Sequence, residues 1–476
     1  MSETIAEMIL PGTYIEVRAE GLIGVGGIAT GNVGVVGTAN RGPLNTVAVL
    51  GSYAEALDVF GAYDRWPAAK TDQANALTLT RTLEQVFRGG ASTVYAVRVA
   101  NLGTTTMASM SWHLDSATDV QLLTLTATSP GTWANAIQGA LSAPDGEPAT
   151  LSLTLGRLKE TFSGANAGEL AAAIQEGSRL VTVAGPSDAN KGTVPKKLVA
   201  STTAGGPDGV PATTTEAAAG LGLLANQPVN IVVVGGLDAK TAAGTVLAHL
   251  EATENDGRER IAVMGASSDE PATLISDDVS KGSNARLILV APGIEAEDAA
   301  RVGEANKAVK LPAPYAAALV AGRLATLAPH ISLTNKDVAA SDLTREYTRA
   351  QQKQLLNNQV LVLFKNLGLR VLKGITTDTG PFRQISVRRI VDYAKAGVRI
   401  GSNPYIGRLN NPRVRAALKA TLDGFLSGMV LDEMLTGYEL DVSATRAQEI
   451  NGQAIVTMVL RPTFSIDYIK VIMNLQ

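Results

Sequence analysis

The sequence predicts a multidomain, mixed α/β (α+β) fold with an α/β core, a β-rich inserted domain, a C-terminal α+β domain and terminal arms that exchange strands. Short apolar runs alternate with helical periodicity before residue 100 and again after residue 208, a pattern typical of a helix-covered parallel sheet. Between them the sequence is rich in Thr, Ser and Ala. With 476 residues, each domain can bury a core of its own.

Residues 1–27 are predicted to form an N-terminal arm and its linker. A period-two alternation places Ile15 and Val17 on one side of an extended segment, and Glu16 and Arg18 on the other. Terminal strands without a partner fray, so we expect this one to pair with a sheet edge of its own subunit or of a neighbour. The glycines expected to let the arm bend are Gly21, Gly24, Gly26 and Gly27.

Residues 28–100 are predicted to form the first part of the α/β core. The apolar run at 32–38 is short enough to be a buried strand, and 93–99 is a second run of this kind. We expect a short helix at 53–60 that ends at Gly61. A longer helix is expected at 72–87, before the glycine pair at 89–90.

Residues 101–208 are predicted to be an inserted, β-rich outer domain bounded by Gly- and Pro-rich turns. Strands are expected at 120–127, 150–158 and 179–183, and one helix at 167–176. We expect the insertion to lie on the outside of any polymer, where contacts between subunits tolerate extra mass best.

Residues 209–340 are predicted to be the second part of the α/β core, because the alternation of strands and helices resumes there. The expected strands lie at 229–234, 260–264 and 286–291. The expected helices lie at 239–252, 271–281 and 314–328.

Residues 341–460 are predicted to be a C-terminal domain, and residues 461–476 a C-terminal arm. The C-terminal 136 residues carry 18 Lys and Arg against 11 Asp and Glu, whereas the first 340 carry 23 against 33. This part of the chain is therefore basic and suits an acidic partner, although a solvated surface explains the charges equally well. Two strand-like runs, at 454–460 and 463–474, are separated by Arg461 and Pro462, and we expect a hinge at Pro462.

One helix of this domain is a candidate for contact with another protein. Asn411 is expected to cap it, with Pro412 at its first position. The apolar stripe expected to face the core comprises Val414, Leu418, Leu422, Phe425 and Met429. The basic residues expected to lie off this stripe are Arg413, Arg415 and Lys419. An ordinary amphipathic surface helix remains the alternative.

The composition excludes several kinds of chemistry. There is no cysteine, so disulfides and thiolate metal sites cannot form. His113, His249 and His330 lie far apart and lack the spacing of a metal site, so we expect no metal. Acidic pairs near 277 and 295 lie in polar stretches typical of a solvated surface, and no nucleophile elbow occurs. We therefore expect no catalytic residue.

An alternative function of another class is that of an α/β enzyme that binds a nucleotide. Gly235 and Gly236 follow an apolar strand and precede a helix, which resembles half of a dinucleotide-binding turn. The third glycine is missing, and Asp238 suits a helix N-cap. The glycines at 21–37 lack the Gly-Lys-Ser/Thr ending of a phosphate loop. We expect no cofactor.

The charge and hydropathy of the chain limit the partners and compartments that we expect for it. A total of 41 basic against 44 acidic residues argues against nonspecific nucleic-acid binding. There is no apolar run of about 18 residues and no basic-then-apolar leader, so we expect neither membrane insertion nor a signal peptide. We expect the chain to fold in a reducing cytoplasm.

Three blocks of sequence resemble contractile phage tail sheath proteins. The first comprises PGTYIE at 11–16, VVGTANRGPLN at 35–45, YAE at 53–55 and VFG at 59–61. The second comprises DLTREYT at 342–348, QQKQLLNN at 351–358 and the strands expected at 360–364 and 369–372. The third comprises RRIVDY at 388–393, PY at 404–405 and NNP at 410–412. The blocks span nearly the whole chain in the expected order.

Two departures from the family pattern affect the expected hairpin geometry. Gln359 stands where many sheath proteins have a glycine after the LLNN run. LKGITT at 372–377 stands where they have Trp-Gly-x-Arg-Thr.

The resemblance implies a structural subunit, and no enzyme, that polymerises around an inner tail tube and contracts to drive the tube through a cell envelope. It implies stacked rings or a helical array of copies in a virion tail assembled in the bacterial cytoplasm, with an inner tail tube protein, baseplate proteins and tail terminator proteins as partners. A phage-derived bacteriocin, an extracellular contractile injection system or a non-contractile shell remain alternatives. The residues expected to exchange strands are Tyr14, Ile15, Glu16, Val17, Arg18, Phe464, Ile466, Tyr468, Ile469, Val471 and Ile472. The residues expected to face the tube are Arg413, Arg415 and Lys419.

Overall fold

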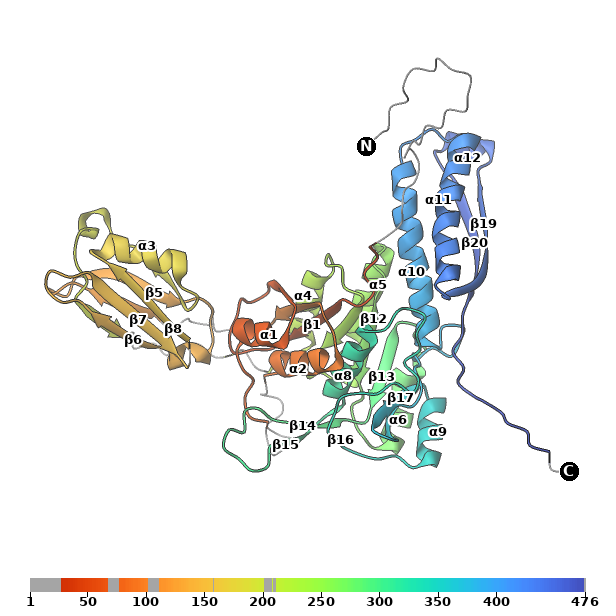
Figure 1. Cartoon of the computed structure of the whole chain (residues 1–476), viewed down its shortest axis with the longest axis horizontal. Coiled ribbons are helices and arrows are strands. Elements are labelled where there is room, and N and C mark those ends of the chain that lie inside the picture. The colour runs from red at the N-terminus through yellow and green to blue at the C-terminus, as the bar shows by residue number, and fades with distance from the viewer. Residues whose placement is uncertain are drawn as a thin grey trace, which may run out of the picture.

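The computed structural model describes residues 27–66, 77–101, 111–156, 158–200, 208 and 211–474. Its centre is an eight-stranded sheet in the order β18-β17-β13-β12-β11-β1-β3-β2 (Figure 1). The six inner strands run parallel, and the two edge strands run antiparallel to their neighbours. The strands are β1 (Val33–Gly37), β2 (Val47–Leu50), β3 (Val94–Arg98), β11 (Ile231–Val234), β12 (Ile261–Gly265), β13 (Leu287–Ala291), β17 (Val360–Lys365) and β18 (Leu369–Val371). The predicted α/β core is confirmed.

Helices cover both faces of this sheet, so β1, β11, β12 and β13 bury every residue, which explains their continuous apolar runs. The first face carries α1 (Tyr53–Phe60), α2 (Leu79–Gly89) and α8 (Ala313–Ala325). The second face carries α4 (Thr214–Leu224), α5 (Ala239–Asn255), α6 (Pro271–Ser276), α7 (Asp278–Lys281) and α9 (Arg349–Asn357).

Helices α2 and α8 pack unusually closely. A Cβ atom on Gly322 of α8 would collide with the carbonyl oxygen of Val86, and one on Gly89 of α2 would collide with that of Leu319. The two backbones can approach this closely because both contact positions lack a side chain. The glycine pair at 89–90 therefore ends α2 and also forms a packing surface.

Some predicted boundaries are wrong. The helix expected at 72–87 begins at Leu79, and residues 72–76 lie outside the described residues. The helix expected at 271–281 is divided into α6 and α7 by Asp277, whose side chain caps α7 by accepting a hydrogen bond from Val279 N. A small sheet was not predicted; it contains β14 (Ile294–Glu297), β15 (Ala308–Leu311) and β16 (Asp342–Leu343).

Residues 111–200 form two small sheets around a separate apolar core. Figure 1 shows this part beside the central sheet, at a distance from the C-terminal helices. The first sheet contains β4 (Ser111–Asp115), β5 (Gln121–Ala127), β9 (Val181–Ala184) and β10 (Lys197–Ala200). The second contains β6 (Gln138–Ser142), β7 (Ala149–Leu155) and β8 (Leu158–Gly164). The helices are α3 (Ala167–Gly177) and the short 3₁₀ segments η2 (Thr132–Ala136) and η3 (Asp188–Asn190).

The inserted part is clamped to the turn that follows β1. Gly131 lies so close to Asn40 that a Cβ atom would collide with the Asn40 carbonyl oxygen. Ser129 Oγ accepts a hydrogen bond from Gly42 N at 3.0 Å. The buried guanidinium of Arg98 donates to the carbonyl oxygens of Gly42 and Pro130, at 2.7 and 2.9 Å. Because these contacts join the central domain to the inserted part, the two parts can move little relative to each other.

The C-terminal residues form a separate unit with a small core of its own. It contains α10 (Ile385–Ser402), η4 (Asn403–Tyr405), α11 (Pro412–Leu431), β19 (Leu435–Ser443), α12 (Arg446–Ile450) and β20 (Ile455–Pro462). Figure 1 shows α10, α11 and the β19–β20 hairpin running side by side away from the central sheet. No helix in the described part of the chain is both long and apolar enough to span a membrane.

An ion-pair network joins α10 to the central domain. Arg286, just before β13, donates hydrogen bonds to both carboxylate oxygens of Glu254 on α5 and to both of Asp392 on α10. Lys395 on α10 also donates to Glu254, at 2.8 Å, and Arg399 pairs with the buried Glu259. Because several bidentate contacts act together, the base of the C-terminal unit is held in a defined orientation.

Candidate assembly surfaces

The β19–β20 hairpin is a two-stranded sheet whose outer edges have no strand beside them in the described chain. Its inward residues, such as Tyr438, Leu440 and Met458, pack on α10 and α11. Its outward side chains alternate with these and are exposed, including Val459 at 48%. A two-stranded sheet with free edges offers main-chain donors and acceptors to a further strand.

The C-terminal run at 463–474, predicted to be a strand, has no strand partner in the described chain. Beyond its first residues, this run leads away from the central domain (Figure 1). The predicted break at Arg461 and Pro462 lies later in the chain, because β20 includes both residues and Pro462 pairs with Leu435. The residues predicted to exchange are largely exposed: Phe464 (64%), Ile466 (80%), Tyr468 (82%), Ile469 (82%), Val471 (72%) and Ile472 (71%).

The N-terminal arm lies outside the described residues, including Tyr14, Ile15, Glu16, Val17, Arg18 and the glycines 21, 24 and 26. Gly27, the first described residue, has a φ of 78° and no atom near its missing side chain. Its left-handed backbone is one that side-chain-bearing residues rarely adopt.

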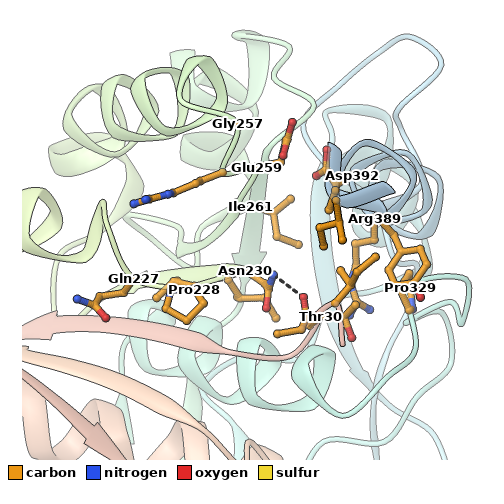
Figure 2. Close-up of a pocket in the computed structure, with 18 of the residues that line it drawn as sticks. Thr30, Gln227, Pro228, Asn230, Gly257, Glu259, Ile261, Pro329, Arg389 and Asp392 are labelled. Carbon is orange, nitrogen blue, oxygen red and sulfur yellow. Dashed lines mark hydrogen bonds between the residues drawn. The ribbon is translucent and has the colours of Figure 1, made fainter. Parts of the chain in front are cut away.

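The chain just after Gly27 is fixed to the core. It borders a cavity of about 460 Å³ between the start of β1, the turn at Gly257 and α10 (Figure 2). Asn230 Nδ2 donates to the Ala29 carbonyl oxygen at 2.9 Å, and Arg389 donates to that of Thr30 at 3.1 Å. Burial lowers the pKa of Arg389 to about 10. Any bending of the arm must therefore occur before Ala29.

Helix α11 begins as predicted, because Asn411 Oδ1 accepts a hydrogen bond from Val414 N and Pro412 takes the first position. The predicted stripe is partly correct: Leu418, Leu422 and Met429 are buried. Phe425 is partly buried and packs on the same core, stacked on Tyr393 at 5.8 Å between ring centres, and Leu426 is a buried residue that the stripe did not include.

The three basic residues predicted to face the tube are in different situations. Arg415 is mostly buried and pairs with Glu449 of α12 at 2.9 Å, so the prediction that it lies free on the surface is wrong. Lys419 is 47% exposed and lies 3.5 Å from Asp441. Arg413 is exposed. Sequence reasoning missed Glu449, because it lies 34 positions away from Arg415 along the chain.

The position where a doubly wound sheet would bind a nucleotide holds only a small cavity. The strand order reverses between β1 and β11, and a cavity of about 200 Å³ lies there, beside Gly37, Gly235 and Gly236. A Cβ atom on Gly236 would collide with the methyl group of Thr78. None of the described lining residues is charged. The glycines thus permit close packing, and Asp238 caps α5 as predicted.

Among the described residues, no group of three or more His, Asp or Glu side chains is placed to hold a metal ion. The exposed features that remain are main-chain edges, apolar side chains and charges, which suit protein–protein association.

Comparison with known proteins places most of the chain in one family. The model of the phage tail sheath protein central domain matches residues 211–377, and that of the phage tail sheath C-terminal domain matches residues 377–476. No curated protein matches the chain in sequence.

Three solved structures share the fold at low identity. The sheath tail protein of Desulfitobacterium hafniense is 17% identical with a TM-score of 0.64, over 95% of this chain and 100% of that one. The sheath tail protein of Listeria innocua is 15% identical with a TM-score of 0.67, over 92% and 93%. The helical sheath of the anti-feeding prophage in its contracted state is 15% identical with a TM-score of 0.55, over 99% of both chains. With two successive domain models covering more than half of its length, the chain belongs to the phage tail sheath protein family.

Proposed function

We propose that this chain is the structural subunit of a contractile tail sheath, which polymerises around an inner tail tube and contracts to drive the tube through a cell envelope. The observation that carries the proposal is that two features occur in the same chain. The β19–β20 hairpin has no further strand paired to its edges in the described chain, and the C-terminal tail is apolar and exposed. An open sheet edge and a strand-prone terminal segment are complementary when they belong to two copies.

The assembly holds together during contraction because its links are main-chain hydrogen bonds at flexible ends. The tail of one copy adds a strand to the hairpin of the next, and the N-terminal arm does the same with its residues 14–18. The domains can then rotate while the strands stay paired. Contraction releases free energy as subunits bury new surface: at about 25 cal/mol per Å², about 300 Å² of apolar area gives about 7 kcal/mol per subunit.

The domains take separate roles in this polymer. The C-terminal unit faces the tube, with Arg413 and Lys419 of α11 available to an acidic tube surface. The inserted part at 111–200 lies outward. Tube, baseplate and tail terminator proteins are the partners, and the assembled sheath forms part of a tail. The same subunit would serve a phage, a bacteriocin or an extracellular injection system.

Removal of the tail tests the proposal most directly. A chain that ends at Tyr468 should fold as the full chain does, because residues 469–474 are all exposed. It should fail to form cylinders in electron micrographs and should sediment as small species. Sheaths of normal length from the truncated chain would contradict strand exchange by the tail. The matched control is Lys470→Gln, which keeps the tail and should assemble.

Disulfide trapping identifies the partner strand, since the chain has no native cysteine. Val471→Cys is combined with Thr457→Cys on β20, or with Asp441→Cys on β19. In oxidised assemblies, at least one of these two cysteine pairs should give a ladder of covalent oligomers. A disulfide within a single chain would instead show that the tail folds back onto its own subunit.

A further inference from the structure

Between β20 and the end of the chain, Asp467 is a buried carboxylate in an otherwise exposed tail. Its side chain is 9% exposed and lies 3.1 Å from Lys373 Nζ. Its carboxylate also accepts hydrogen bonds from Thr334 Oγ1 at 3.4 Å, Gln384 Nε2 at 3.3 Å and Ser465 Oγ at 3.1 Å. Carboxylates are rarely buried unless they are paired, and this one has four polar neighbours.

The base of the tail contacts the same site through two further residues. Ser465 N donates to Gln384 Oε1 at 3.4 Å. Lys373 Nζ donates to Tyr468 Oη at 3.1 Å and lies 4.9 Å from the centre of the Tyr468 ring. Burial acts to lower the pKa of Lys373, but its bonds to Tyr468 and Asp467 raise it overall, so the ammonium stays charged.

The exposure pattern marks where this contact ends. From 463 to 468 the side chains alternate: Thr463, Ser465 and Asp467 face the subunit and are partly covered, and the residues between them are exposed. From Ile469 to Asn474 every residue is exposed and the alternation stops. The segment 463–468 therefore lies extended along its own subunit, and the chain departs from it after Tyr468.

We propose that Asp467 and its partners Lys373, Thr334 and Gln384 form a clip that fixes the tail to its own subunit, so that the strand given to a second copy begins at Ile469. Asp467 is a positioning residue in this scheme, and the inference rests on the proposed strand exchange. The clip uses the stretch LKGITT, where this chain departs from the family pattern, since Lys373 belongs to that stretch.

The clip changes the geometry of the exchange. A free strand over the described residues 463–474 would have 12 residues, whereas one that starts at Ile469 keeps six of them. At about 3.3 Å per residue, six residues reach about 20 Å. Phe464, Ile466 and Tyr468 then form a fixed apolar stripe beside the departure point, which a second copy can cover.

Site-directed spin labelling tests the clip on the unassembled full chain. One label is placed at Ile466→Cys, inside the clipped segment, and another at Val471→Cys, beyond it. The label at 466 should move more slowly than the one at 471. Asp467→Ala should raise the mobility at 466 to that at 471 and leave 471 unchanged. Lys373→Met, which keeps the hydrogen bonds of Thr334 and Gln384, should give an intermediate mobility.

The control is Asp441→Asn, an exposed carboxylate of β19, which should leave both labels unchanged. Circular dichroism establishes that each variant is folded. Equal mobility at 466 and 471 in the otherwise native chain would overturn the clip, as would an Asp467→Ala chain with unchanged mobility at 466. In assembled sheaths, a slow label at 466 with a label at 471 that stays mobile would leave the clip intact and refute strand exchange by the tail.

Discussion

The central eight-stranded sheet and the C-terminal hairpin are completed to different degrees by the residues of one chain. In the central sheet, the inner strands are covered on both faces by helices of the same chain. In the hairpin, one face packs on α10 and α11, the other face is exposed, and neither edge has a strand beside it among the described residues. One chain thus suffices to complete the core, whereas the C-terminal unit presents surfaces that a further copy can complete. Stability should accordingly depend on core packing, and assembly on the hairpin and tail.

The largest expected effect tests the core side of this comparison. Gly322→Val places a side chain against the backbone of α2, so α2 and α8 must separate. We expect the free energy of unfolding to fall by at least about 3 kcal/mol, measured by chemical denaturation. The control is Gly244→Ala on α5, where nothing lies near the added atom, and a gain of about 0.5–1 kcal/mol is expected. Equal effects from the two changes would show that the α2–α8 contact is not tight.

The second prediction separates stability from assembly within the C-terminal unit. Arg415→Glu places a second carboxylate beside Glu449 in a mostly buried site and should lower stability by about 2 kcal/mol. Arg413→Glu, on the exposed side of the same helix, should leave the thermal midpoint unchanged and weaken co-assembly with inner tubes. If Arg413→Glu subunits co-assemble normally, Arg413 does not face the tube.

The third prediction concerns the joint between the two regions. Hydrogen bonds from Arg286, together with one from Lys395, lower the pKa of Glu254 to about 2. The unfolded carboxyl has a pKa of about 4.3, so the stabilisation is complete above that pH and is lost as the pH falls towards 2. Because the side chain is 32% exposed, we expect only about 1–2 kcal/mol.

Denaturation of Glu254→Gln at several pH values measures this contribution. The variant should be less stable than the native chain at pH 7, and the gap should close in acid. Glu251→Gln, an exposed position on the same helix, should show no such gap. A gap for Glu254→Gln that persists unchanged to the acid end would contradict the pairing as its source.

The smallest expected effect comes from Gln359, just before β17. Its φ is 59°, a left-handed conformation that favours glycine, and its buried Oε1 has no hydrogen-bond partner in the described structure. Gln359→Gly relieves both costs and should stabilise the chain by up to about 1 kcal/mol. Gln359→Ala removes the amide but keeps the backbone strain, so it should gain less. Thermal melts of the two variants give the comparison.

Sequence patterns were most successful at predicting features that depend on residues close together along the chain. The strands at β1, β3 and β11 and the caps of α5 and α11 followed from apolar runs and single capping side chains. The split between α6 and α7 was missed because the Asp277 side chain was not recognised as a second cap.

Features that depend on distant residues could not be predicted. Arg415 lies off the apolar stripe in sequence, yet Glu449 from a later helix pairs with it. The tail has strand propensity, but pairing needs an edge, and propensity does not say which chain supplies one. Asp467 looked like one polar residue in an alternating run, because Lys373, Thr334 and Gln384 come from three separate segments.

The inserted part is held tightly against the turn after β1, so it is a suitable place to attach other proteins in a fixed orientation. Gly131 against Asn40, and the Arg98 bonds to Gly42 and Pro130, fix its orientation. A peptide or enzyme grafted into the exposed turn at Gly146, between β6 and β7, would be carried at a set angle on every copy. Such a fusion would turn a polymer of this chain into a regularly spaced nanoscale display.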